Sequence, residues 1–211
     1  MNKEFVTRNY SFNAETRDDE EKGVGIIEGC PIVFEQKTNL GYFDEVIKKG
    51  ALDKADLKDV RLCLNHDTSY VYARSRNNNE NSTMQLKPHE KGMDFRAELD
   101  IKNSPKSQDY YSAVKRKDID KMSFMFTIDE EEWVDLDTDH PTRYIKSIGK
   151  VLEISAVTFP AYDGTEISAR DKNALDNAKA ALDSAKTRSL DRGQAVKALE
   201  LEKAKNKNKI Y

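Results

Sequence analysis

Short apolar runs separated by Gly, Asn and Asp recur along residues 5–170, and this pattern constrains the fold more than any other feature of the chain. The clearest runs are VRLCLNH (60–66), KMSFMFTI (121–128) and KVLEISAVTF (150–159). Each run is short and bounded by turn-forming residues, which is typical of strands. The sequence therefore predicts a mainly β domain.

Other segments extend this prediction. GVGIIEGCPIVFEQ (23–36) is a strand or strand pair, and STMQLKPHEKGMDFRAEL (82–99) is a hairpin with its turn near His89–Gly92. A Ser-Pro start and a basic last turn predict a helix over residues 104–119. The acidic, turn-rich residues 129–144 are predicted to form an exposed loop or hairpin tip.

The character of the sequence changes near residue 170. Ala and Leu recur at helical spacing in NALDNAKAALDSAKT (173–187), and a similar stretch follows Gly193. Residues 170–211 hold 11 Lys and Arg against 6 Asp and Glu, although the whole chain has a net charge of -3. We therefore predict a domain over residues 1–170 and a helical, basic tail over residues 171–211. Its charge suits an acidic partner but does not establish nucleic-acid binding.

Cysteine and histidine usage predicts neither disulfides nor a metal site. The two cysteines, Cys30 and Cys63, lack metal-ligand spacing and are interpreted as reduced thiols. The histidines lack zinc-binding spacing, so no metal and no cofactor are predicted. No apolar run resembles a signal core or a membrane span, so we expect a soluble, cytosolic protein with no membrane partner.

Of the three histidines, His66 is the candidate for acid-base chemistry. It ends an apolar strand, and strict alternation would place it on the face of Leu62 and Leu64, at the rim of the sheet. A strand end holds a general base while leaving it accessible. His89 and His140 lie beside prolines in predicted turns and are expected to be exposed.

Ser123 and Glu153 are the other two candidates. Alternation puts Met122 and Phe124 on one face of their strand, and Ser123 with Met125 on the other. Spacing alone favours a buried serine that bonds the backbone over a catalytic one. Glu153 is a single carboxylate within a long apolar strand, so it requires a partner such as the His66 imidazole. A serine, a histidine and an acid together supply a nucleophile, its base and an orienting carboxylate.

Four segments resemble, in order, the prohead proteases of tailed bacteriophages of the HK97-like type. They are residues 27–52, the Asn-His-Asp region at 60–75, the helix leading into the Met-Ser-Phe motif at 118–128, and EISAVTFPAY within 152–170. The resemblance implies a fold distantly similar to the β-barrel of herpesvirus assembly proteases. It identifies Ser123 as nucleophile, His66 as general base and Glu153 as orienting acid, and Ser155 is also part of the family pattern.

This chain departs from that pattern at two points. Met125 stands where relatives usually have Gly, which can narrow the site, and an Asn-rich insertion follows Arg74. Backbone amides or an arginine such as Arg74 are candidates for oxyanion donors, although an exposed loop arginine without such a role is the favoured interpretation of Arg74. Neither departure removes a proposed catalytic group.

The resemblance implies a serine endopeptidase that cleaves scaffold, the N-terminal segment of the major capsid protein and itself, inside the immature prohead in the host cytoplasm. The tail then serves as a contact for scaffold or capsid, a removable linker, or a coiled-coil handle in a homo-oligomer. The alternative is a non-catalytic assembly protein that retains the protease fold. A generic serine esterase is disfavoured because the chain has no Gly-x-Ser-x-Gly motif.

Overall fold

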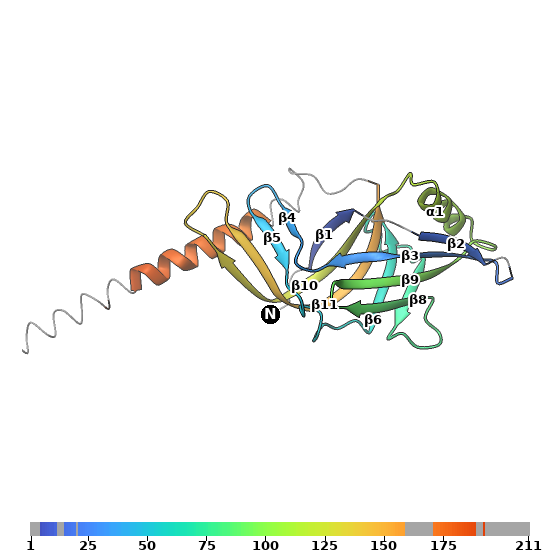
Figure 1. Ribbon diagram of the computed structural model, residues 1–211, viewed down its shortest axis with the longest axis horizontal. Helices are drawn as coiled ribbons and strands as arrows, with labels where there is room; N and C mark the ends of the chain where they lie inside the picture. Colours follow the sequence, from blue (N-terminus) through green and yellow to red (C-terminus); the bar gives the residue numbers. More distant parts are fainter. Residues whose placement is uncertain (1–4, 12–14, 20, 159–170, 189–191, 193–211) are drawn as a thin grey trace, which may run out of the picture.

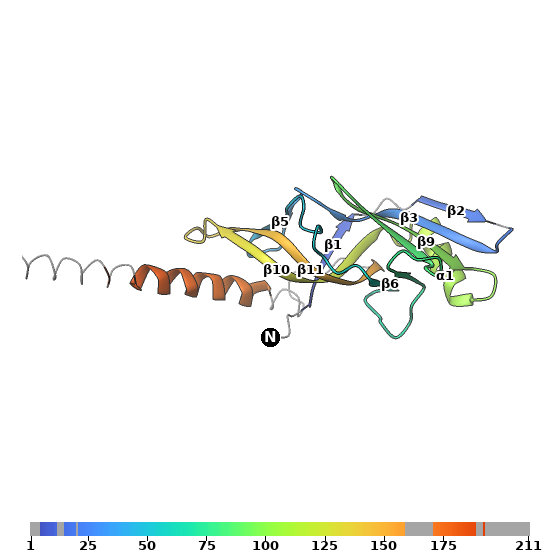
Figure 2. The same cartoon turned by 90° about the horizontal axis from the view of Figure 1, so that it is seen from below.

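The computed structural model describes residues 5–11, 15–19, 21–158, 171–188 and 192, in which two β-sheets form the body and a long helix extends from it (Figures 1 and 2). The strands are β1 (Phe5–Ser11), β2 (Glu15–Asp19), β3 (Val24–Val33), β4 (Lys37–Asn39), β5 (Asp44–Ile47), β6 (Asp59–Leu64), β7 (Ala73–Arg76), β8 (Met84–His89), β9 (Gly92–Asp100), β10 (Lys121–Val134) and β11 (Thr142–Val157), and helix α1 is Pro105–Lys115.

The 7-stranded sheet is built around β11. Strand β10 pairs antiparallel with one edge of β11, and β1 pairs with the far edge of β10. Strands β5 and β6 both run parallel to β11, β5 beside its start and β6 beside its end. The outer strands β4 and β7 then pair with β5 and β6. The residues near the end of β11 therefore have β10 on one side and β6 on the other.

The 4-stranded sheet has the order β2-β3-β9-β8, and the core lies between the two sheets. Its apolar face contributes buried residues such as Ile27, Met93 and Phe95, and the larger sheet contributes Phe124 and Ile154. Alternation along each strand puts these side chains on one face and polar side chains on the other. The alternating pattern in the sequence thus predicts the core correctly.

Helix α1 begins and packs as its sequence predicts. The Ser104 hydroxyl accepts a hydrogen bond from the backbone N–H of Ser107 at 3.2 Å, and Pro105 occupies the first helical turn. The buried face of the helix includes Tyr110 and Tyr111. These rings close one end of the core.

The mainly β class with a few helices is confirmed, as are the hairpin at residues 82–99 and the helix within residues 104–119. A closed barrel is not found within the described ranges. The strands there form two separate sheets, because β1, β4 and β7 each pair on one side only. Residues 129–144 were predicted to form an exposed loop or hairpin tip. They form the end of the β10–β11 hairpin, but the loop is shorter than predicted, since β10 continues to Val134 and β11 already begins at Thr142.

Residues 171–188 form the predicted tail helix, which points away from the body on the side of the β10–β11 hairpin tip (Figures 1 and 2). Asp171 and Leu175 in its first turns are buried, whereas residues 183–188 are exposed. The second predicted helical stretch, after Gly193, and the boundary at residue 170 lie outside the described residues.

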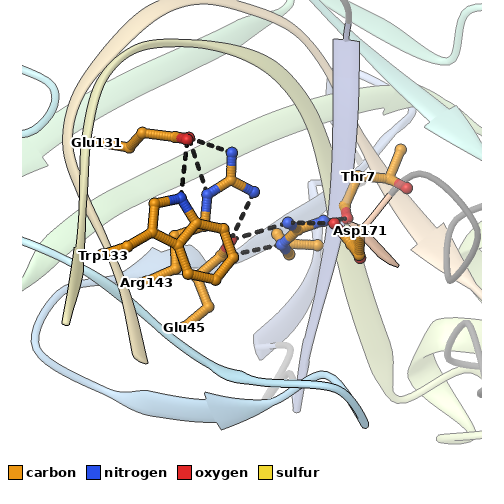
Figure 3. A network of polar contacts seen from close by, with 7 residues as sticks. Thr7, Glu45, Glu131, Trp133, Arg143 and Asp171 are labelled. Carbon is orange, nitrogen blue, oxygen red and sulfur yellow. Dashed lines mark hydrogen bonds and ion pairs between the residues drawn. The ribbon is translucent and has the colours of Figure 1, made fainter. Parts of the chain in front are cut away.

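A group of charged side chains, Arg8, Glu45, Glu131, Arg143 and Asp171, joins the start of this helix to the sheet, and we call it the ion cluster (Figure 3). The Arg8 guanidinium donates two hydrogen bonds to Glu45 and one, of 2.9 Å, to Asp171. Arg143 lies 3.5 Å from Glu45 and also pairs with Glu131. Burial raises the pKa of Asp171 above its ordinary value, although Arg8 acts against this.

Candidate active site

Strand β11 carries the centre of the site, with Glu153 and Ser155 on one face. Ser123 of β10 lies directly across from Ser155, and Met125 lies across from Glu153. On the other side Cys63 of β6 is the partner of Ser155. Side chains of directly paired residues stand on the same face of a sheet. These five side chains therefore form one patch on the face opposite the core residue Phe124.

His66 reaches this patch by a tight turn after the end of β6. Asn65 and His66 both have left-handed backbone conformations, with φ of 51° and 60°. Such conformations cost non-glycine residues about 1 kcal/mol or more each and require support from their surroundings. The Asn65 Oδ1 atom accepts from the backbone N–H of Thr158 at 2.9 Å, and the His66 N–H donates to Ser155 Oγ at 3.2 Å.

The face predicted for His66 was therefore wrong. Strict alternation would have put the ring on the side of Leu62, which is a core residue. The two left-handed residues redirect the chain, so that His66 contacts Ser155 and Glu153 on the opposite face.

The predicted partner of Glu153 is found. Glu153 Oε1 lies 2.6 Å from His66 Nδ1, and Glu153 Oε2 accepts a short hydrogen bond from the Ser155 hydroxyl. The Glu153 side chain is fully buried, whereas the His66 side chain is 23% exposed. Both oxygens of this buried carboxylate are thus paired, which offsets the cost of removing it from water.

The contact with Glu153 also determines which tautomer a neutral His66 imidazole adopts. A carboxylate only accepts, so the proton of a neutral His66 ring lies on Nδ1 and the lone pair lies on Nε2. The nitrogen able to take a proton therefore faces away from the acid. Nearby, burial and, to a smaller extent, the Glu153 charge raise the pKa of the Cys63 thiol to about 12.

Ser123 lies in this patch with its hydroxyl uncommitted. Its side chain is fully buried, and its Oγ atom has no hydrogen-bond partner among the residues that the structure describes. A structural serine in such a place usually bonds the backbone, because an unpaired buried hydroxyl costs free energy. Met125 beside it is half-buried across from Glu153.

The Arg74 guanidinium is paired with Asp59 in this structure. Its Nε atom lies 2.6 Å from Asp59 Oδ1 and its Nη2 atom 2.9 Å from Asp59 Oδ2. This bidentate pair lowers the pKa of Asp59, chiefly through the hydrogen bond from Arg74. Oxyanion donation by Arg74 therefore stays a prediction.

The other two histidines have carboxylate neighbours; His140 is exposed as predicted, whereas His89 is only partly exposed. His140 Nε2 lies 3.0 Å from Asp44 Oδ1 and, chiefly through this hydrogen bond, lowers the pKa of Asp44. His89 Nε2 lies 3.1 Å from Asp94 Oδ1, near Cys30 on the outer face of the 4-stranded sheet.

The group of Cys30, His89 and Asp94 was not recognised in the sequence, because its members come from three separate strands. Their potential ligand atoms lie within 4.8 Å of one another. However, His89 Nδ1 accepts the backbone N–H of Lys91 at 3.1 Å, so the proton of a neutral ring lies on Nε2. That nitrogen then has no lone pair to offer a metal, which makes the group a poor metal site.

A hollow of about 550 Å³ lies on the same outer face and is separate from the Ser123 patch. Its lining mixes both signs of charge and comes from strands β2, β3, β8 and β9: Glu15, Glu28, Gly29, Cys30, Gln85, Lys87, Asp94, Phe95 and Arg96. Among the described residues, no helix is long and apolar enough to span a membrane.

Comparison with known proteins gives a family match over most of the chain. The family described as caudovirus prohead serine protease matches residues 12–180. No curated protein matches the sequence. Among solved structures, the bacteriophage T4 capsid assembly protease, gp21, is similar with a TM-score of 0.44 and 10% identity, over 72% of this chain and 96% of that one.

Proposed function

The chain belongs to the caudovirus prohead serine proteases, and from this premise we propose that it is a serine endopeptidase in which Ser123 is the nucleophile, His66 the general base and Glu153 the orienting acid. The observation that carries the proposal is the 2.6 Å contact between His66 Nδ1 and Glu153 Oε1, on the face where Ser123 stands. It supplies a base and its orienting acid on the same face of the sheet as the Ser123 hydroxyl, and a hydrogen bond from Ser123 Oγ to His66 Nε2 has still to form.

The roles follow from the directions of the hydrogen bonds. Glu153 holds the His66 proton on Nδ1, so Nε2 takes the proton of Ser123 as Oγ attacks the peptide carbonyl. The imidazolium that results is stabilised by the buried carboxylate and then protonates the leaving amine. Water repeats the sequence to release the acyl group from Ser123.

The complete burial of Ser123 places a further requirement on the mechanism. A peptide carbonyl must come within bonding distance of Oγ, and a side chain with no exposed surface does not admit one. In the proposed mechanism, substrate binding or assembly therefore has to uncover the serine.

We propose as substrates the scaffold, the N-terminal segment of the major capsid protein and the protease itself, cleaved within the prohead in the host cell. Residues 1–170 form the protease domain in this proposal, and residues 171–211 form a tail that links it to scaffold or to a second copy. The packing of Asp171 and Leu175 on the body supports a tail that is anchored at its start.

Co-expression with the major capsid protein tests the proposal. Mass spectrometry should find truncated capsid protein or self-cleaved protease, and Ser123→Ala or His66→Ala should abolish both products, with losses of about 10³-fold or more. Glu153→Gln should lower the rate less severely, because the nucleophile and base remain. Ser75→Ala is the matched control, since Ser75 is equally buried on β7, away from the site.

Cleavage that persists in Ser123→Ala would refute the assigned nucleophile. If the wild-type protein cleaves neither the capsid protein nor scaffold nor itself, the non-catalytic assembly role is favoured instead, in agreement with the buried Ser123 side chain.

A further inference from the structure

The hydroxyl of Ser155 joins the acid of the site to the backbone of its histidine. Ser155 Oγ donates to Glu153 Oε2 and accepts the backbone N–H of His66 at 3.2 Å. The side chain is fully buried between its strand partners Ser123 and Cys63. It therefore touches both members of the His66–Glu153 pair at once.

The directions of these two hydrogen bonds are fixed by chemistry. A backbone N–H only donates and an ionised carboxylate only accepts, so the single proton of the Ser155 hydroxyl points to Glu153 and its lone pair to His66. Ser155 thus has no proton to give to another base. This distinguishes it from Ser123, whose Oγ has no partner among the described residues.

The two bonds hold two different things in place. The bond to Oε2 sets the rotation of the Glu153 carboxylate, which directs Oε1 at His66 Nδ1. The bond from the His66 N–H holds a residue whose φ of 60° is unfavourable for a side chain larger than glycine. Ser155 Oγ therefore holds both the Glu153 carboxylate and the backbone of the histidine that this carboxylate orients.

We propose that Ser155 is a positioning residue that sets the geometry of the His66–Glu153 pair, an inference that rests on the proposed function of that pair. Ser155→Ala removes the hydroxyl but keeps the backbone of β11. It leaves Glu153 free to rotate and the His66 turn without one of its tethers. Because the general base His66 is then less precisely placed, we expect kcat to fall by about 10- to 100-fold and KM to change by less than about twofold.

Proton NMR of the His66 Nδ1–H measures the positioning without any need for activity. A short hydrogen bond to a buried carboxylate deshields this proton and slows its exchange with water. The resonance is assigned by its loss in His66→Gln. In Ser155→Ala it should move upfield or exchange faster, whereas Ser75→Ala, which removes another fully buried hydroxyl, should leave it unchanged.

Ser155→Cys distinguishes the loss of the hydrogen bonds from the loss of side-chain volume, because a thiol has a similar shape to the hydroxyl but is a weak donor. It should show the same NMR change as Ser155→Ala and a similar loss of kcat for truncation of purified major capsid protein. If circular dichroism finds that neither variant folds, the role of Ser155 is structural and the proposal is overturned.

Different results would refute the positioning role of Ser155 and the proposed protease function. An unchanged Nδ1–H resonance and unchanged kcat in a folded Ser155→Ala protein would overturn the role of Ser155, even when Ser123→Ala is inactive. Conversely, cleavage by Ser123→Ala would refute the proposed function, while a changed resonance in Ser155→Ala would still show that Ser155 positions the pair.

Discussion

Removing the cation at the centre of the ion cluster should destabilise the protein strongly. Arg8 is 2% exposed and is bonded to Glu45, which is also 2% exposed, and to Asp171, which is 5% exposed. Arg8→Met keeps much of the side-chain volume but leaves two buried carboxylates without their main partner. Removal of one member of a buried ion pair costs about 3–5 kcal/mol, so we expect a loss of about 4 kcal/mol.

Urea unfolding provides the assay. With a slope of about 2 kcal/mol per molar urea, a loss of about 4 kcal/mol lowers the midpoint by about 2 M. Trp133 is the single tryptophan of the chain and lies over Arg143 of the ion cluster, 5.4 Å from its guanidinium to the ring centre. Its fluorescence reports on this region, and far-UV circular dichroism reports on the whole fold.

A neutralised variant tests the cause. Arg8→Met combined with Glu45→Gln and Asp171→Asn removes the unpaired charges, so it should recover much of the lost stability. A midpoint for Arg8→Met that corresponds to a loss below about 1 kcal/mol would refute the reasoning. So would a triple variant no more stable than the single one, because the loss would then come from packing and not from charge.

Two further predictions concern titratable groups. Because burial raises the pKa of Asp171 above 3.8, its contribution to stability is present below that pH and is lost as pH rises through the folded-state pKa. Thermal unfolding from about pH 4 to about pH 7 should therefore find the wild-type protein losing stability relative to Asp171→Asn, and a constant difference would contradict this. Cys63 is fully buried and its thiol pKa is raised to about 12, so in the folded protein iodoacetamide should modify the half-buried Cys30 first. In urea it should modify both cysteines at similar rates, and mass spectrometry follows both reactions. Equal rates in the folded protein would contradict the burial of Cys63.

Strand periodicity was a good guide wherever the backbone stays regular. The alternation around Phe124 predicted which side chains enter the core, and the lone carboxylate at Glu153 predicted a buried partner. The position of His66 could not be read in the same way, because two consecutive left-handed residues end the alternation. Asn and His adopt left-handed conformations more often than most residues, but less readily than glycine, so Asn65-His66 is only a weak signal for that turn.

The acidic residues 129–144 illustrate a second limit. Composition favours a loop, but pairing with β11 makes strand residues of Glu130, Glu131 and Glu132. Strand formation depends on cross-strand neighbours more than on intrinsic preference, and these neighbours are distant in the sequence. The ion cluster is hidden for the same reason, since Arg8 and Asp171 are 163 positions apart.

The β10–β11 ribbon also determines where the chain can change in length. Its register shifts at several places between Met125 and Glu131, and each shift resets which side chains share a face. One residue inserted or deleted there would turn either Ser123 or the ion cluster to the wrong side. The turn at residues 135–138 is free of this restriction, because it only connects the two strands. Variation among relatives, and any inserted peptide or label, should therefore be confined to that tip.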